Sequence, residues 1–157
     1  MKVQFKLNGR TISEEVEPNE TLLDFLREKI NLTSVKKGCD EGDCGACTIL
    51  LNGKPVRSCL LLAVQMREGD EVNSVEGLAK PGETSEIQDA FVEKYGFQCG
   101  FCTPGMILTT KALLDEKPQP TVEEIKDQFE GNLCRCTGYQ QIIDSVQRAA
   151  ELRAGRR

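Results

Sequence analysis

The chain has 157 residues and a formal net charge of −5, and 39% of its residues are hydrophobic. This length predicts one domain or two small ones, and the hydrophobic content excludes global disorder. The negative charge argues against a nucleic-acid partner, which would need clustered lysine and arginine. Eight cysteines and no histidine are present. Catalytic zinc sites that depend on histidine are thereby excluded, as are Ser-His and Cys-His nucleophile pairs.

Nothing in the sequence indicates membrane insertion or export. No hydrophobic run reaches the roughly 18 residues of a membrane span. Residues 1–8 alternate in polarity and lack the apolar core of a secretory signal. We therefore expect a cytoplasmic protein. Because disulfides are rare in that compartment, most of the cysteines are expected to be metal ligands.

Strand patterns dominate the first half of the chain. Residues 3–7 alternate in polarity and Asn8-Gly9 follows, which predicts a β-hairpin with a type I′ turn. Thr21, with Asp24 three residues on, is expected to cap a helix. The later expected elements are a buried strand at 48–51, a turn at 52–53, a strand at 54–58, a short helix at 60–66 and a strand at 71–75. Strands interleaved with one helix predict a β-grasp sheet.

The second half shows helical patterns and no strand. A linker is expected at 77–83. Four helices are expected: from Ser85 to about Tyr95, from Pro104 to Glu116 with Thr103 as N-cap, from Thr121 to Phe129, and from Tyr139 to about Leu152. The fold class is thus α+β, with domains at 1–76 and 77–157. Halves of this size are marginal with a hydrophobic core alone, so a cofactor held by four cysteines would stabilise each.

Four cysteines of the first half lie in a Cys39-x4-Cys44-x2-Cys47 motif, with Cys59 eleven residues further on. This is the spacing of plant-type [2Fe–2S] proteins. Three glycines of this loop are expected to let the backbone wrap around a cluster and bring amide N–H groups to its sulfurs: Gly38, Gly42 and Gly45. Zinc and disulfides remain as alternatives, although zinc sites usually use paired Cys-x2-4-Cys motifs.

The other four cysteines form Cys99-x2-Cys102 and Cys134-x-Cys136, with 31 residues between the two pairs. Both pairs are expected about two residues ahead of a helix. Helix N-termini favour thiolates and an anionic cluster, so we predict a second iron–sulfur cluster here. Zinc is its main competitor.

Residues around these motifs give weaker signals. Gly131-Asn132 and Gly138 are expected to be ordinary caps, and Gln98 a solvated loop residue. Arg135 either balances the charge of a cluster or points to water. No nucleotide-binding glycine motif and no acid–base pair is present. The pattern indicates an electron carrier without a catalytic residue.

Three stretches together resemble the small iron–sulfur subunit of the molybdenum hydroxylases, the xanthine dehydrogenase/oxidase family. They are GCDEGDCGACTIL at 38–50, QCGFCTPGM at 98–106 and GNLCRCTGY at 131–139. The resemblance implies a plant-ferredoxin-like β-grasp domain followed by a four-helix domain. It also implies an outer cluster on Cys39, Cys44, Cys47 and Cys59, and an inner cluster on Cys99, Cys102, Cys134 and Cys136. Gln98 and Cys136 match positions that lie against the pterin of the molybdenum cofactor.

The resemblance further implies a function and partners. Electrons would pass through two [2Fe–2S] clusters between a molybdopterin site on a large subunit and FAD on a medium subunit. The chain stops after the helical domain, which favours a separate-subunit enzyme, a heterotrimer or its dimer. Two alternatives stay open: a free-standing ferredoxin-like carrier and a zinc-stapled adaptor.

Overall fold

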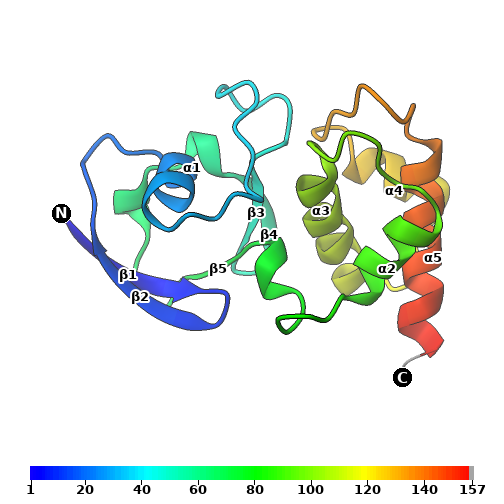
Figure 1. The fold of residues 1–157 in the computed structure, drawn as a ribbon, viewed down its shortest axis with the longest axis horizontal. Helices are drawn as coiled ribbons and strands as arrows, with labels where there is room; N and C mark the ends of the chain where they lie inside the picture. Colours follow the sequence, from blue (N-terminus) through cyan, green and yellow to red (C-terminus); the bar gives the residue numbers. More distant parts are fainter. Residues whose placement is uncertain (156–157) are drawn as a thin grey trace.

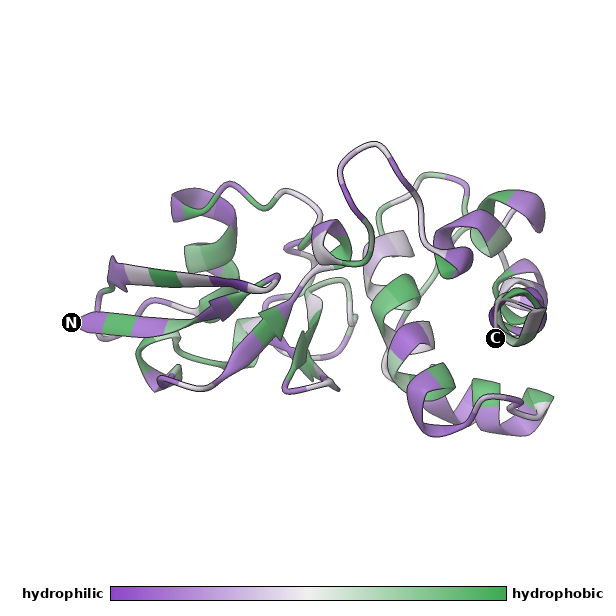
Figure 2. Ribbon diagram, turned by 90° about the horizontal axis from the view of Figure 1, so that it is seen from below, coloured by the Kyte–Doolittle hydropathy of each residue, from purple (hydrophilic) through white to green (hydrophobic). Residues whose placement is uncertain are grey.

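The N-terminal hairpin forms as its alternating pattern predicts. β1 (Lys2–Leu7) buries every second side chain and pairs antiparallel with β2 (Arg10–Glu15). Asn8 and Gly9 have φ angles of 49° and 78°, both in the left-handed region that a type I′ turn requires. The hairpin prediction is confirmed, and Figure 2 shows the alternation of hydrophobic and hydrophilic residues along these strands.

A computed structural model describes residues 1–155, so the predicted second domain is described up to Gly155. The hairpin is one edge of a five-stranded sheet with the order β2-β1-β5-β3-β4 (Figure 1). The remaining strands are β3 (Thr48–Leu51), β4 (Lys54–Arg57) and β5 (Glu71–Asn73). β1 and β5 are parallel, whereas the other neighbours are antiparallel. The sheet is therefore mixed, and together with the helices it makes the fold α+β.

The helix that packs on this sheet is only partly α-helical. After one turn, α1 (Leu22–Asp24) continues as the π-helical segment η1 (Phe25–Lys29). Its last N–H, on Ile30, donates to the carbonyl of Phe25, five residues earlier, at 3.2 Å. Four side chains of this segment are completely buried: Leu22, Leu23, Phe25 and Leu26. All four belong to the same hydrophobic cluster as the buried residues of β1.

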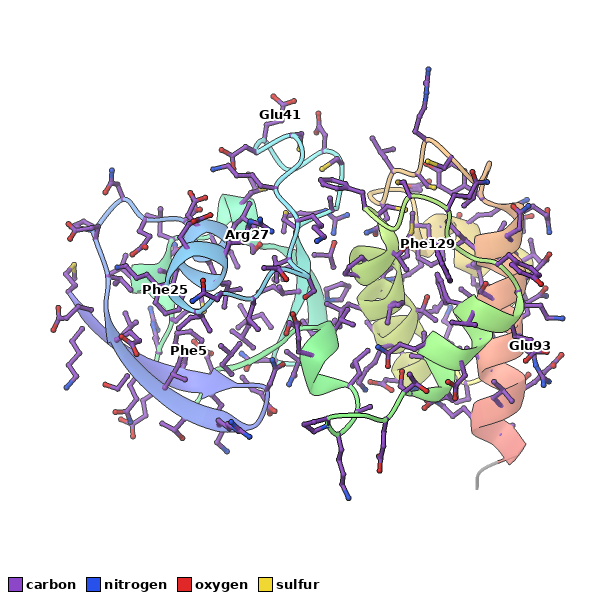
Figure 3. The ribbon with its side chains drawn as sticks, in the orientation of Figure 1. Phe5, Phe25, Arg27, Glu41, Glu93 and Phe129 are labelled. Atoms are coloured by element: carbon purple, nitrogen blue, oxygen red, sulfur yellow. The ribbon has the colours of Figure 1, made fainter. Side chains whose placement is uncertain are left out.

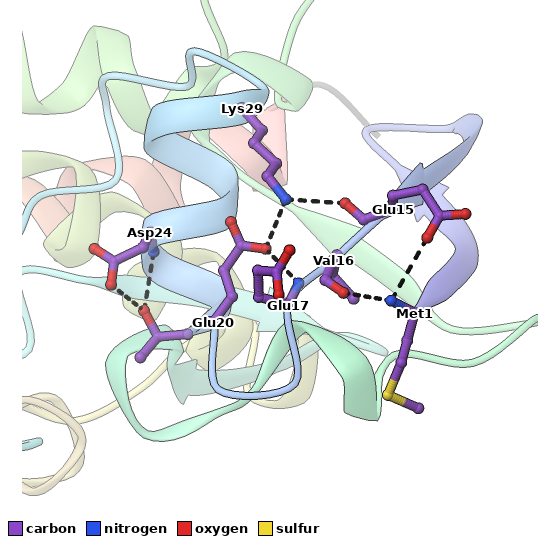
Figure 4. Close-up of polar contacts among 8 residues, drawn as sticks. Met1, Glu15, Val16, Glu17, Glu20, Asp24 and Lys29 are labelled. Carbon is purple, nitrogen blue, oxygen red and sulfur yellow. Dashed lines mark hydrogen bonds and ion pairs between the residues drawn. The ribbon is translucent and has the colours of Figure 1, made fainter.

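Polar contacts hold the start and end of this helix (Figure 4). The Thr21 hydroxyl accepts from the Asp24 N–H at 3.0 Å, which confirms the predicted cap. At the other end, the Lys29 ammonium donates to the Glu15 carbonyl and to the Glu20 carboxylate, each at 2.9 Å. These contacts join η1 to the end of β2, although exposed pairs of this kind contribute less than about 1 kcal/mol.

The predicted helix at 60–66 is wrong. The segment contains two single 3-10 turns, η2 (Ser58–Leu60) and η3 (Ala63–Gln65). The Leu61 carbonyl accepts from the Leu22 N–H, at the start of α1, at 2.7 Å. The Ala63 N–H donates to the Glu20 carbonyl, just before α1, at 2.9 Å. These long-range bonds occupy backbone groups that a continuous helix would use for itself.

The second half contains the helices α2 (Glu86–Glu93), α3 (Thr103–Glu116), α4 (Val122–Gln128) and α5 (Gln140–Gly155) (Figure 1). Ser85 and Thr121, the predicted starts of two helices, are the N-caps of α2 and α4, and each forms a capping box with the residue three positions on.

The starts of α3 and α5 differ from the prediction. Cys102 is the N-cap of α3, and Thr103, predicted as the cap, is its first residue. The start of α5 is delayed because Gly138 and Tyr139 both have positive φ angles, 63° and 72°. Cys136 therefore lies four residues ahead of α5 rather than two or three.

The buried hydrophobic side chains form two separate clusters. One lies between the sheet and the α1–η1 helix and includes Phe5 and Phe25, whose ring centroids are 6.0 Å apart (Figure 3). The other fills the space among α2, α3, α4 and α5. Val75 and Leu78 pack against this second cluster, so the 3-10 turn η4 (Val75–Gly77) already contacts the helical half. Within residues 1–155, no helix is long and apolar enough to cross a membrane.

Candidate metal centres

The loop at 38–47 brings three thiols next to a fourth in η2, directly after β4. Cys47 and Cys59 are buried, with their sulfur atoms 3.4 Å apart. Cys39 and Cys44 form a second pair that is bonded reciprocally: the Cys44 N–H lies 3.3 Å from the Cys39 sulfur, and the Cys39 N–H lies 3.4 Å from the Cys44 sulfur. Cys59 also interacts electrostatically with Cys39, so the four cysteines of the first predicted site lie together as two pairs.

Further amide groups of this loop point at the same sulfur atoms. The Glu41 N–H donates to the Cys39 sulfur and the Ala46 N–H donates to the Cys44 sulfur, both at 3.5 Å. Gly42 and Gly45 have φ angles of 91° and 72°. Side chains disfavour this conformation, so these two glycines let the backbone turn its N–H groups inward, as predicted. The third predicted glycine, Gly38, does not have a positive φ angle, although a Cβ there would lie 2.7 Å from the Cys44 sulfur.

The four remaining cysteines also meet as two pairs. Cys99 and Cys136 are exposed, with their sulfur atoms 3.6 Å apart. Cys102 and Cys134 are partly buried and interact through their side chains. Residues from before α3 and from before α5 thus converge, as predicted.

The chain after Cys134 wraps around its thiol. The Thr137 hydroxyl oxygen lies 3.1 Å from the Cys134 sulfur, and the Thr137 N–H donates to that sulfur at 3.5 Å. The Tyr139 hydroxyl accepts from the Cys134 N–H at 2.9 Å. Sequence reasoning did not single out these two residues. A threonine three residues after a ligand is a detectable signal, since its hydroxyl can bond locally.

Hydrogen bonding and burial shift the pKa values of these thiols in opposite directions. The N–H groups of Cys44 and Glu41 lower the pKa of Cys39 to about 7. In contrast, burial raises the pKa of Cys59 and of Cys102 to about 12 in each case. Cys59 and Cys102 are therefore protonated at neutral pH, and they would release these protons on serving as thiolate ligands of a metal.

The spacing of two sulfur pairs fits the binding of each pair to one tetrahedral metal ion. A tetrahedral metal with metal–sulfur distances of about 2.3 Å sets two thiolates about 3.8 Å apart. The observed separations of 3.4 and 3.6 Å are close to this value. A [2Fe–2S] cluster takes four thiolates in all, two at each iron. All eight cysteines are free thiols, and within the described residues no three Cys, Asp or Glu side chains surround a single ion position.

The loops that carry most of the cysteines of the two groups lie on the same side of the molecule (Figure 1). The Leu133 N–H, next to Cys134, donates to the Cys44 carbonyl at 2.9 Å. Phe101 also reaches across, since its ring lies 3.6 Å from where a Cβ on Gly38 would be. A backbone hydrogen bond therefore links Cys44 of the first group to the residue next to Cys134 of the second group.

The predicted role of Gly131-Asn132 as a helix cap is wrong. α4 ends at Gln128, and Asn132 is buried between the two halves of the chain. Gln98 and Arg135 are exposed in the loops beside the second group of cysteines. The acidic part of the first cysteine loop is also exposed, with Glu41 at its tip (Figure 3).

Comparisons with known proteins agree with this arrangement. Residues 5–79 match the 2Fe-2S iron-sulfur cluster binding domain, and residues 74–147 match a second model described as a [2Fe-2S] binding domain. The chain is 53% identical over 149 residues to the nicotinate dehydrogenase small FeS subunit of Eubacterium barkeri, covering 95% of this chain and 94% of that subunit. It belongs to the small [2Fe–2S] subunits of the molybdenum hydroxylases.

Other members of the family extend this result. The small iron–sulfur subunit described here is 46% identical to the nicotine 6-hydroxylase small subunit of Paenarthrobacter nicotinovorans, over 93% of this chain and 87% of that one. Its fold matches quinoline 2-oxidoreductase from Pseudomonas putida 86 with a TM-score of 0.93, at 46% identity over 99% of this chain and 97% of that one. It also matches the aldehyde oxidoreductase from Desulfovibrio desulfuricans with a TM-score of 0.94, at 42% identity, over 98% of this chain but only 17% of that longer chain. The protein is a non-catalytic electron-transfer subunit of an oxidoreductase, with [2Fe–2S] clusters as its cofactors.

Proposed function

We propose that this subunit relays electrons between a molybdopterin site on a large partner subunit and FAD on a medium partner subunit. The observation that carries the proposal is the hydrogen bond from the Leu133 N–H to the Cys44 carbonyl, which joins the two groups of cysteines. An electron relay requires the two cluster-binding sites to lie close together. Cysteines with a purely structural role in each half would not need to be near each other. When bound, the clusters supply centres that gain and lose one electron at a time.

The ligand sets follow from the way the thiols pair. We propose that the outer cluster is held by Cys39, Cys44, Cys47 and Cys59, and the inner one by Cys99, Cys102, Cys134 and Cys136. The separate hydrophobic clusters of the two halves support a division into domains at 1–76 and 77–157. The strand order and the helix packed on the sheet support a ferredoxin-like β-grasp in the first domain, and α2 to α5 support a four-helix second domain.

The residues around the thiols have a role beyond ligation. Amide N–H groups of the first loop donate to the sulfurs of Cys39 and Cys44, and the Thr137 N–H donates to that of Cys134. Such donors favour negative charge on sulfur, so they stabilise the more negative, reduced state and raise the reduction potential.

We propose that the large subunit docks over the exposed thiols of Cys99 and Cys136. Large hydrophobic side chains are exposed around this position: Phe97 at 40%, Phe101 at 45% and Leu133 at 55%. Apolar side chains gathered at one place on a surface are typical of a protein interface. In this arrangement Gln98 and Cys136 contact the pterin, while the loop of the outer cluster faces the medium subunit.

The test is isolation of the complex through a tag on this chain, followed by metal and flavin analysis. We expect a red-brown complex with about four irons per chain, two for each cluster, together with molybdenum and FAD. A red-brown monomer that copurifies with neither would instead support a free-standing carrier. A colourless protein with two zinc ions would support the adaptor.

Two further properties of the complex are proposed. Its mass should correspond to a heterotrimer or a dimer of heterotrimers. We also propose a cytoplasmic location, because the free thiols needed for cluster assembly persist in that compartment. Recovery of the complex in a periplasmic fraction would contradict this location.

The proposed contact of Gln98 with the pterin predicts a kinetic effect. Changing Gln98 to alanine in the complex should leave both cluster signals in the EPR spectrum. It should slow reduction of the clusters by substrate roughly three- to tenfold, the effect of about one lost hydrogen bond. The matched control is Gln119→Ala, since Gln119 is exposed in the loop beyond the far end of α3. Equal rates in the two variants would reject the role of Gln98.

A further inference from the structure

The Asn132 side chain connects three segments from both halves of the chain. It is only 3% exposed. Its amide nitrogen donates to the Gly45 carbonyl at 3.2 Å and lies 3.3 Å from the Thr48 hydroxyl. It therefore contacts both the cysteine loop at 38–47 and the start of β3. Its amide oxygen accepts from the Thr109 hydroxyl of α3 at 3.1 Å. One buried amide therefore bonds the loop of the outer cluster to the helix that follows Cys102.

The neighbours of Asn132 in the sequence reinforce this connection. The Gly131 carbonyl accepts from the guanidinium of Arg57, which also donates to the Thr48 hydroxyl at 3.0 Å. On the other side, the Leu133 N–H donates to the Cys44 carbonyl. Three consecutive residues ahead of Cys134, namely Gly131, Asn132 and Leu133, are thus hydrogen-bonded to the first half of the chain.

The two backbones approach so closely here that side chains are excluded. A Cβ on Gly45 would overlap the Gly131 carbonyl oxygen, and a Cβ on Gly105 would lie 2.6 Å from the Gly45 carbonyl oxygen. Contacts of this kind fix the position of one loop relative to the other, because neither backbone has space to move. Hydrogen bonds in such a buried place are also stronger and more directional than on the surface.

We propose that Asn132 is a positioning residue that holds the two cluster-binding loops at a fixed separation and so sets the rate of electron transfer between the clusters. This inference rests on the proposed relay function. Within residues 1–155, the hydrogen bonds of the Asn132 side chain go to Gly45, Thr48 and Thr109 and not to a proposed ligand side chain. It acts through the backbone of Gly45, which lies between Cys44 and Cys47, and through α3, which begins directly after Cys102.

The test compares variants of the full chain loaded with iron and sulfide. Asn132→Asp keeps the shape of the side chain but removes its N–H donors. Thr109→Val removes only the hydroxyl that donates to Asn132. The matched control is Asn8→Asp, because Asn8 makes a similar pair of bonds to Ser74, at 2.9 Å each, away from the cysteines.

The main measurement is the magnetic coupling between the two reduced clusters in the EPR spectrum. We expect Asn132→Asp to keep four irons and both individual signals but to lose or reduce the coupling, and Thr109→Val to have a smaller effect of the same kind. In the complex, transfer between the clusters should be slower in Asn132→Asp than in the unmodified chain. Asn8→Asp should keep the coupling of the unmodified chain.

Wild-type coupling and transfer rate in both Asn132→Asp and Thr109→Val would overturn the positioning role. If Asn132→Asp does not fold, Thr109→Val decides alone. The proposed relay fails in a different way, when the unmodified chain binds no iron–sulfur clusters or the complex contains no molybdenum. The two failures are therefore distinguishable.

Discussion

Replacing Cys136 with alanine is expected to remove one of two EPR signals from the iron-loaded chain and to leave the other unchanged. Cys136 pairs with Cys99 at 3.6 Å, so its loss leaves one iron with a single thiolate from the protein. The four cysteines of the other site lie between residues 39 and 59 and belong to a half with its own hydrophobic core. Iron should fall from about four to about two per chain.

The reciprocal variant is the control for this experiment. Cys39→Ala removes one thiolate of the first site and should abolish the signal that Cys136→Ala retains. The iron content should again fall by about half. Loss of both signals in either variant would mean that the sites do not assemble independently, and retention of both would mean that the altered cysteine is not a ligand.

Local sequence signals predicted most of the secondary structure. Asn8-Gly9 defined its turn because both φ angles must be positive there, and Thr21 marked its helix start through a bond three residues away. The helix predicted at 60–66 failed for the opposite reason. Its backbone groups at Leu61 and Ala63 bond a segment about 40 residues away, and no local pattern reports that competition.

In the candidate site, too, features that depend on local sequence were predictable, whereas features that depend on contacts between distant residues were not. The spacing of the cysteines predicted two groups of four, because each group needs a loop of a certain length to surround a cluster. The connection between the groups was not predictable in this way. Asn132 resembled a cap in the sequence, and Arg57 gave no signal at all. Their partners in the other half of the chain, Gly45 for Asn132 and Gly131 for Arg57, lie 87 and 74 residues away, so their role depends on how the two halves pack.

The close packing of the two halves at Gly45 predicts a second large effect, on the stability of the protein. Changing Gly45 to alanine should destabilise the protein strongly, for two reasons. The φ angle of 72° at this residue is unfavourable for any side chain, which costs about 1–2 kcal/mol. In addition, the new Cβ would overlap the Gly131 carbonyl oxygen and lie 2.8 Å from the Asn132 amide nitrogen. Forcing an extra group into a packed region adds about 1–3 kcal/mol.

Gly53→Ala separates these two contributions. Gly53 has a similar φ angle of 80°, but a Cβ there would have no atom within 4 Å. It should therefore show the backbone cost alone. The measurement is the temperature at which the visible absorbance of the clusters is lost at a fixed heating rate, and each kcal/mol corresponds to about 2–4 °C for a chain of this size. We expect the shift for Gly45→Ala to be roughly twice that for Gly53→Ala, together with a change in the magnetic coupling of the clusters that Gly53→Ala does not cause. Equal shifts and unchanged coupling would show that the close approach of the two loops holds neither the fold nor the clusters in place.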